Sequence, residues 1–338
     1  MLVFIKSILQ GRIEFGNQKS FDKVFKMFEY RTETYYKNDI IMTQEEAFDS
    51  ELLSLEVPRY VGQHTEKSFR NTVSLLQYCA QFAISGEIRA WQTENGKVLR
   101  YAYIEPESDK AAVINFRKGK ELVGSDGREQ EALDALSKAI DKYNRHAYAY
   151  EKRGEVNFTL KKYHDALRDF NKCLAIDDTI PDAYLGKANI AMHNEDYDEA
   201  IKNLEFSIKK SIALQPIYWK SRRLKAECHI KKEEFEKAAA DLKLLTNRKF
   251  DKDNYNYKWR KQNLNLYGKV LAELEQYKEA IKVFEAVEEI DIDYNFNEGE
   301  FLYYRGLSKK KSRKRDFVKD LKRASELGIK KAEILLKK

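Results

Sequence analysis

The spacing of hydrophobic residues along the chain differs before and after residue 106. Up to that position, short alternating runs indicate β-strands, and two runs with apolar residues three and four apart indicate amphipathic helices. The strand-like runs lie at residues 7–16, 52–62 and 86–106, and the helix-like runs lie at residues 20–37 and 65–83. Their order predicts a small α+β domain of the type β-α-β-α-β-β, with an antiparallel or mixed sheet and two helices on one face.

Individual residues support these predicted elements. Ser20 and Thr65 open the two helix-like runs, where a hydroxyl side chain can cap free backbone N–H groups. Asn95 and Gly96 interrupt the last strand-like run, and this dipeptide favours the tightest hairpin turns. The last run is therefore expected to supply two strands, and the domain is expected to end near Pro106.

From residue 111 onward the pattern is helical, and it repeats. An aromatic residue, followed three places later by a small residue, opens four apolar stripes: "YHDALRDF" from Tyr163, "YDEAIKNL" from Tyr197, "FEKAAADL" from Phe235 and "YKEAIKVF" from Tyr277. Weaker copies surround Ala132 and follow Phe317, where Asp320 replaces the alanine. The equivalent positions 132, 166, 200, 238, 280 and 320 are 34 to 42 residues apart. Such a period predicts an array of helix pairs.

A second small residue lies twelve positions before the alanine in four copies, at Gly154, Ala188, Ala226 and Gly268. Two small residues at this spacing allow the helices of a pair to cross closely. With these motifs, about residues 111–338 resemble the tetratricopeptide repeat family. The resemblance implies antiparallel helix pairs in a right-handed superhelix whose concave groove is lined by the first helix of each pair.

The expected fold is therefore α+β but mainly α. An α-solenoid of about six tetratricopeptide-like helix pairs, residues 107–338, follows the small domain of residues 1–106. A turn at Gly328 and a short amphipathic helix are expected to cover the last apolar face.

The charge, the hydrophobic runs and the cysteines indicate the cellular compartment in which we expect the protein. The net charge of +7 is uneven, because residues 1–110 hold 14 basic and 16 acidic residues. No run approaches the roughly 20 apolar residues that cross a bilayer, and we expect no secretory signal in the first residues. Cys79, Cys173 and Cys228 are far apart, and each lies in a helical pattern. We expect reduced core cysteines in a cytoplasmic protein.

No motif indicates catalysis. "GSDG" at residues 124–127 is expected to be a turn, and the five histidines do not pair at metal-ligand spacing. Cys79 lies on an apolar stripe, where a thiol stays protonated. Glu151 and Glu155 have the spacing of a solvated helix face. We therefore expect a protein that is not an enzyme and that has no cofactor or metal.

The groove offers the best candidate site. The family register places these residues in it: Arg117 and Glu121; Tyr148, Glu151 and Glu155; Asp182, Leu185 and Asn189; Lys220, Arg223 and Glu227; Gln262, Asn265 and Lys269. The early pairs lack the basic clamp with which the family holds a chaperone's acidic tail. The later pairs carry two basic-aromatic clusters, "IYWKSRRLK" at 217–225 and "YNYKWRKQN" at 255–263. The predicted partner-binding residues are Lys220, Arg223, Asn265, Lys269, Trp219, Tyr257 and Trp259.

Three functions follow from these patterns. The first is a protein-interaction scaffold that binds a partner segment of acidic character in the groove, although the same aromatic residues could instead pack between lengthened helices. The second is a nucleic-acid or anionic-ligand adaptor, for which the run "KKKSRKR" at 309–315 would be an exposed basic loop. The third is an enzyme with its site in the small domain. The sequence favours the first and predicts no membrane span.

Overall fold

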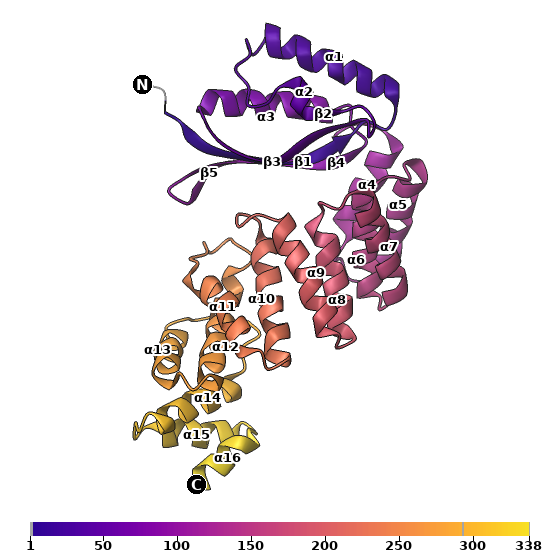
Figure 1. Ribbon diagram of the computed structural model, residues 1–338. Helices are drawn as coiled ribbons and strands as arrows, with labels where there is room; N and C mark the ends of the chain where they lie inside the picture. The colour runs from indigo at the N-terminus through magenta and orange to yellow at the C-terminus, as the bar shows by residue number, and fades with distance from the viewer. Residues whose placement is uncertain (1–2, 293, 338) are drawn as a thin grey trace. The chain divides into compact units, whose positions relative to one another are not determined.

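The computed structural model describes residues 3–292 and 294–337 (Figure 1). The chain forms two compact lobes, an N-terminal lobe up to Ala183 and a C-terminal lobe from Tyr184 onward. The boundary falls within the eighth helix, so the N-terminal lobe contains the sheet together with the first helices of the array. None of the helices in the described ranges is both long and apolar enough to span a membrane.

The N-terminal lobe contains a five-stranded antiparallel sheet in the order β2-β3-β1-β4-β5. The strands are β1 (Ile5–Glu14), β2 (Phe48–Asp49), β3 (Ser54–His64), β4 (Ser85–Glu94) and β5 (Lys97–Ile104). Asn95 and Gly96 form the predicted turn between β4 and β5, with φ angles of 49° and 79°. Gly11 in β1 has to be glycine, because a Cβ atom there would lie 2.1 Å from the backbone oxygen of Glu87.

Helices α1 (Gln18–Thr34) and α3 (Glu66–Ala80) cover one face of the sheet (Figure 1), as predicted. Their apolar stripes enter one core with the inward side chains of the strands, including Leu9, Ile13, Leu55 and Ile88. The predicted β-α-β-α-β-β order is confirmed. The structure adds a short helix, α2 (Gln44–Ala47), and the two-residue strand β2.

One of the two predicted helix caps is correct. Thr65 caps α3, since its side chain accepts a hydrogen bond from the Ser68 backbone N–H at 3.1 Å. For α1 the predicted Ser20 cap is wrong. Asn17 is the cap, and its side chain accepts the hydrogen bond from the Ser20 backbone N–H at 2.9 Å. The helix therefore begins three residues earlier than a Ser20 cap would place it, because Asn caps as well as Ser does.

The described part of the remaining chain, residues 111–292 and 294–337, forms six helix pairs and a final helix, which confirms the predicted array. The pairs are α4 (Ala111–Leu122) with α5 (Glu129–Lys142), α6 (Ala147–Thr159) with α7 (Tyr163–Ile176), α8 (Pro181–His193) with α9 (Tyr197–Lys210), α10 (Pro216–Lys231) with α11 (Phe235–Asn247), α12 (Arg260–Glu273) with α13 (Tyr277–Glu288), and α14 (Glu298–Lys311) with α15 (Phe317–Glu326). A 3₁₀ turn, η1 (Tyr257–Trp259), precedes α12. As predicted, Gly328 has a left-handed φ of 88° and precedes α16 (Lys330–Lys337), whose Ala332 is fully buried.

Small residues lie where the helices of a pair cross. A Cβ atom on Gly154 would lie 2.7 Å from the Phe170 ring, and one on Gly268 would lie 2.5 Å from the Phe284 ring. In the first pair the corresponding residue is Gly119, whose added Cβ would lie 2.6 Å from Leu136. This residue is thirteen positions before Ala132 and not twelve. The register of the first pair is therefore shifted by one residue from the one used to assign Arg117 and Glu121 to the groove, and both residues are exposed.

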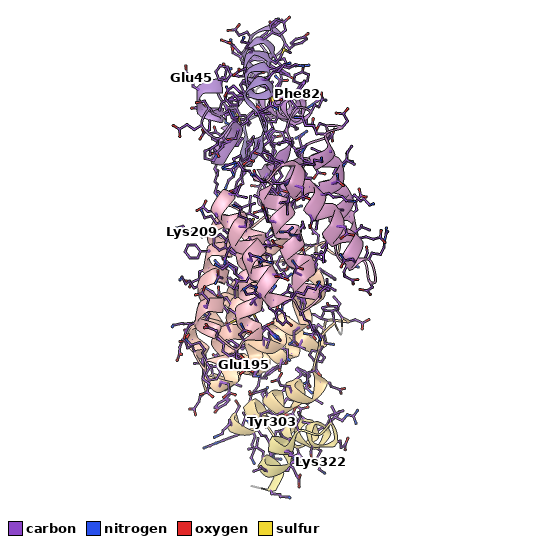
Figure 2. All side chains as sticks on the ribbon, turned by 90° about the vertical axis from the view of Figure 1, so that its right-hand side faces the viewer. Glu45, Phe82, Glu195, Lys209, Tyr303 and Lys322 are labelled. Carbon is purple, nitrogen blue, oxygen red and sulfur yellow. The ribbon has the colours of Figure 1, made fainter. Side chains whose placement is uncertain are left out.

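A left-handed residue connects the helices in each of the last five pairs. These residues are Lys161, Glu195, Glu233, Glu275 and Arg313, with φ angles between 58° and 60°. Figure 2 labels Glu195, which lies between α8 and α9. Glycine is the residue that usually occupies such positions. The sequence pattern gave no sign of them, because charged residues stand there.

The basic run at 309–315 is only in part the exposed loop that we predicted, since Arg313, Lys314 and Arg315 are exposed in the connection between α14 and α15. Its first three lysines belong to α14, which ends at Lys311. The Lys309 ammonium lies 2.7 Å from the Asp316 carboxylate and 2.9 Å from the Asp320 carboxylate. Lys310 donates a hydrogen bond of 2.6 Å to the backbone oxygen of Leu335. These lysines hold the last helix pair together, and only residues 312–316 form the connection.

Candidate partner-binding face

The first helices of the last three pairs lie next to one another in the C-terminal lobe. α12 packs on α14, and η1 contacts α10 because the Arg223 guanidinium lies 3.6 Å from the centre of the Trp259 ring. At the positions that the repeat register assigns to the groove, α10 and α12 carry six polar side chains, and Glu300 of α14 pairs with one of them. We name these seven the first-helix face: Lys220, Arg223, Glu227, Gln262, Asn265, Lys269 and Glu300.

Arg223 joins the two basic-aromatic clusters that the sequence singles out. Its side chain is 5% exposed, it stacks on Trp259, and its Nη1 atom lies 2.6 Å from the Glu227 carboxylate. Trp259 in turn packs edge-on against Tyr294, with ring centres 4.8 Å apart. A buried guanidinium over an indole ring is a strong cation–π arrangement. The face therefore contains a packed cluster of one cation and two aromatic rings.

Asn265 lies in α12, six residues after Trp259 of η1, and it is 1% exposed. Within residues 3–292 and 294–337, neither its amide nitrogen nor its amide oxygen has a hydrogen-bond partner. Gln262 Oε1 and Trp259 Nε1 are likewise buried without a partner in the described chain. A buried polar atom without a hydrogen bond costs about 1–3 kcal/mol. With Asn263 Oδ1, which is also buried without a partner in the described chain, five such atoms lie within seven residues, and they need an explanation.

Lys269 connects α12 to α14. Its ammonium lies 2.5 Å from the Glu300 carboxylate and 5.4 Å from the centre of the Tyr304 ring. The Tyr304 hydroxyl donates a hydrogen bond of 2.6 Å to Glu273, and burial followed by this bond raises the pKa of Tyr304. The carboxylate of Glu300 thus occupies the position at which a partner's carboxylate could approach Lys269.

Three predicted site residues have other surroundings. Lys220 is half-buried, with its ammonium 6.0 Å from the centre of the Tyr255 ring. Tyr257 is half-buried in η1. Trp219 is 9% exposed and packs in a core with α11 and α12, and its indole N–H donates a hydrogen bond of 2.8 Å to the Ala213 oxygen. Its contacts are those of a residue that holds α10 in place.

Some partners in this region were missed at the level of sequence. Glu227 was placed in the groove but not recognised as the partner of Arg223, and Glu300, the partner of Lys269, was not identified. Tyr294 was also missed; with Tyr255 of the second cluster it flanks the Lys258 ammonium, at 4.4 and 4.6 Å. The four-residue spacing of Arg223 and Glu227 was a usable signal for one pair. The others depend on how segments far apart in the sequence fold together.

Two further predictions about ionisable groups can be compared with the structure. Cys79, Cys173 and Cys228 are all free and buried, as expected, and burial raises the pKa of Cys79 to about 12. Glu151 is not on a solvated face. It is 3% exposed, and burial raises its pKa, although the Lys152 ammonium lies 3.4 Å away.

A charged cleft of about 460 Å³ lies among α9, α10 and α11. Its basic residues already have carboxylate partners. The Arg222 guanidinium lies 2.5 Å and the Lys225 ammonium 3.1 Å from the Asp241 carboxylate, and Lys232 pairs with Glu234 at 3.2 Å. In the described ranges, no group of three or more His, Cys, Asp or Glu residues is arranged to hold a metal ion. The cleft therefore offers less to a ligand than the first-helix face does.

Comparison with known proteins agrees with the repeat pattern. The tetratricopeptide repeat family matches residues 181–253 and 262–293. A segment of 59 residues is 41% identical to the human DnaJ homolog subfamily C member 7, and it spans 18% of this chain but only 12% of the human protein.

Two solved structures have a similar fold. One is YrrB, described as a tetratricopeptide repeat protein with an unusual peptide-binding site, with a TM-score of 0.51, 20% identity, and coverage of 61% of this chain and 98% of YrrB. The other is PilF of Pseudomonas aeruginosa, with a TM-score of 0.52, 16% identity, and coverage of 68% and 99%. At these identities the likeness concerns the fold alone. The matched repeats, the six helix pairs and the small residues at their crossings identify tetratricopeptide repeats in residues 181–293, within a longer array of helix pairs.

Proposed function

We propose that this protein is an interaction scaffold that binds an extended segment of a partner protein on the first-helix face, with main-chain contacts to Asn265 and with a preference for acidic side chains. Repeat proteins of this family serve as protein-interaction scaffolds in general. The partner's acidic character and the position of its segment are our inference.

The observation that carries the proposal is the unpartnered side chain of Asn265. A carboxamide offers one acceptor and two donors. A peptide group in an extended segment offers one N–H and one C=O, and so it can satisfy both ends of the Asn265 side chain at once. Trp259 Nε1 and Gln262 Oε1 are also buried without a partner in the described residues, and they could bind a carbonyl and an N–H of the same segment.

The charges of the face support an acidic segment. Lys220, Arg223 and Lys269 contribute three cations, and Glu227 and Glu300 contribute two carboxylates, each within 2.6 Å of one of these cations. A carboxylate of the partner could replace Glu227 or Glu300 as hydrogen-bond acceptor, because both glutamates are partly exposed. Charge-assisted hydrogen bonds of this kind are stronger than neutral ones.

Selection from a random peptide library displayed on phage tests the proposal on the full-length protein. The selected peptides should be rich in Asp and Glu, and they should bind the Asn265→Leu variant at least about tenfold more weakly, as expected when one or two hydrogen bonds are lost. A matched control is Asn171→Leu, which changes an exposed asparagine of α7. Basic peptides, or equal binding to the Asn265→Leu variant, would contradict the proposal.

The nucleic-acid alternative has less support. The lysines at 309 and 310 are used in the last helix pair, which leaves a smaller basic surface than the sequence indicates. Binding that rests on phosphate contacts would fall steeply between roughly 50 and 200 mM salt. Peptide binding through Asn265 and Trp259 should change much less over that range.

We also propose a cytoplasmic setting. Three free cysteines persist without pairing in a reducing compartment. Their burial in helices suits structural thiols, and no function that we propose requires a cofactor or a catalytic group.

A further inference from the structure

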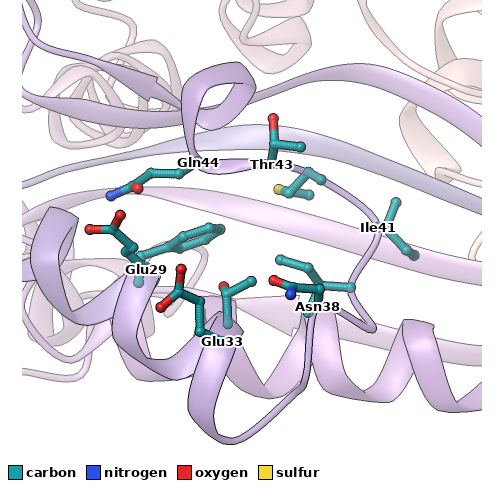
Figure 3. Close-up of a pocket in the computed structure, with 10 residues that line it drawn as sticks. Glu29, Glu33, Asn38, Ile41, Thr43 and Gln44 are labelled. Atoms are coloured by element: carbon teal, nitrogen blue, oxygen red, sulfur yellow. The ribbon is translucent and has the colours of Figure 1, made fainter.

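The N-terminal lobe contains a slot between α1 and residues 38–44. Its volume is about 270 Å³. Phe28, Glu29, Thr32 and Glu33 of α1 line one side, and residues 38 and 40–44 line the other (Figure 3). Sites for drug-sized ligands are typically about 300–1,000 Å³. The slot is therefore suited to a single side chain and not to a larger molecule.

Hydrogen bonds hold the slot open and define its two ends. At one end the Asn38 backbone N–H donates to the Thr32 oxygen at 2.9 Å. At the other end the Gln44 side-chain nitrogen donates to the Phe25 oxygen at 2.6 Å. Between them, the Ile41 backbone N–H is bound to the side chain of a threonine of α3 at 2.9 Å. The wall opposite α1 is thus fixed without any contribution from Glu29 or Glu33.

The floor of the slot is apolar and its rim is acidic. Phe28 and Met42 are 1% and 8% exposed, and both belong to the core beneath the sheet-covering helices. Glu29 and Glu33 are exposed on the rim, one helical turn apart, and Figure 3 shows both carboxylates extending from α1 toward residues 43 and 44.

Three polar side chains that α1 contributes to the slot have no partners among the described residues. Within the described residues, neither Glu29 nor Glu33 forms an ion pair or a side-chain hydrogen bond, unlike most carboxylates of the lobe. Thr32 Oγ1, on the same turns of α1, is buried and also has no hydrogen-bond partner there. Two free carboxylates and one free hydroxyl therefore border a preformed apolar slot.

We propose that the slot binds one arginine side chain of a partner polypeptide. The aliphatic part of arginine would lie on Phe28 and Met42, and its guanidinium, which has five N–H donors, would reach Glu29, Glu33 and Thr32 Oγ1. A divalent cation is a poor candidate, because it needs about six oxygen ligands and would lie against an apolar floor. The slot is separate from the first-helix face, so this proposal does not depend on the proposed function.

Methyl NMR of the full-length protein tests the proposal. Methionine labelled with ¹³C at the ε-methyl group reports on the slot through Met42, while Met192, which lies in α8 of the C-terminal lobe, serves as an internal reference. Titration with N-acetyl-arginine amide should shift the Met42 signal in a saturable way and leave Met192 unchanged. The citrulline analogue, which has the same shape without the charge, should bind at least about fivefold more weakly.

Variants separate the slot from non-specific charge effects. Glu29→Gln with Glu33→Gln should weaken binding of the arginine amide about five- to tenfold, as expected for two partly exposed ion pairs. Thr32→Val should weaken it two- to fivefold. Glu45→Gln, on α2 but outside the slot lining, should leave it unchanged. An unshifted Met42 signal, equal binding of citrulline, or undiminished binding to the double variant would overturn the proposal.

Discussion

His146 shows how a single buried residue makes the N-terminal lobe sensitive to pH. It is 1% exposed, it caps α6 by accepting a hydrogen bond from the Ala149 backbone N–H at 3.3 Å, and its Nδ1 atom lies 3.2 Å from Ser85 Oγ. Complete burial lowers the pKa of His146 from 6.5 to about 3. The folded protein must keep this imidazole neutral, whereas the unfolded chain can protonate it near pH 6.5.

The expected result is a loss of stability in acid. Because the pKa is lowered on folding, the stabilisation is complete above pH 6.5 and is lost as the pH falls toward 3, by about 1.4 kcal/mol per pH unit. Urea unfolding of the N-terminal lobe between pH 7 and pH 4 measures this slope. His146→Asn, which can still cap the helix, should reduce it. The same slope in both proteins would show that His146 is not responsible.

Gly154 tests the close crossing of a helix pair. A methyl group at this position would meet the Phe170 ring at 2.7 Å, so Gly154→Ala should destabilise the protein by about 1–3 kcal/mol despite the better helix propensity of alanine. Thermal unfolding of this variant can be compared with Lys172→Ala on the exposed face of α7. A Gly154→Ala protein as stable as wild type would mean that the crossing is looser than the structure shows.

At the residue scale, the sequence was informative about which residues matter but not about their contacts. Its basic-aromatic clusters contain Arg223 and Trp259, which the structure brings into contact. It could not show that Trp219 packs in the core, because Trp219 and Trp259 both stand among basic and aromatic residues in the sequence. Nor could it show that Glu300, 31 residues after Lys269, would supply the partner of that lysine.

Among the elements, the left-handed residues between paired helices offer a direct test of local strain. Glu275 has a φ of 58°, a conformation in which a side chain costs about 1–2 kcal/mol. Glu275→Gly should raise the free energy of unfolding by about 0.5–1 kcal/mol. The substitution relieves the backbone strain, but glycine also increases the backbone entropy of the unfolded chain, which offsets part of that stabilisation. Glu275→Ala keeps the Cβ atom, so it is the matched control in chemical denaturation and should give no such gain.

Long periodic elements were predictable from the sequence, and short ones were not. The six helix pairs follow from repeated apolar stripes, and the β4–β5 turn follows from Asn95 and Gly96, because these signals act over many residues or through a strong backbone preference. The helix α2 and the strand β2 have four and two residues, too few to show a period. The basic run at 309–315 was misjudged in part because its partners, Asp316, Asp320 and the Leu335 oxygen, come from later elements.

At the scale of the whole molecule, the division into residues 1–106 and 107–338 remains our proposal. The sheet and the first helices of the array share one lobe, in which the Tyr143 hydroxyl donates a hydrogen bond of 2.7 Å to Glu14, and Arg12 lies 3.4 Å from the Asp177 carboxylate. A chain of residues 107–338 should keep its helices, but α4 to α7 should exchange their amide hydrogens faster than in the full-length protein. Loss of helical content would place the domain boundary elsewhere.

The central claim is that the first-helix face binds a partner segment through main-chain contacts and basic side chains. Isothermal titration calorimetry with an acidic peptide selected on the full-length protein tests this most directly when the Arg223→Ala, Lys269→Ala double variant is measured beside wild type. We predict that the double variant loses binding at least about tenfold while its circular dichroism still shows a folded helical protein, although loss of the buried Arg223 side chain lowers its melting temperature. Unchanged affinity in a folded double variant would contradict the account.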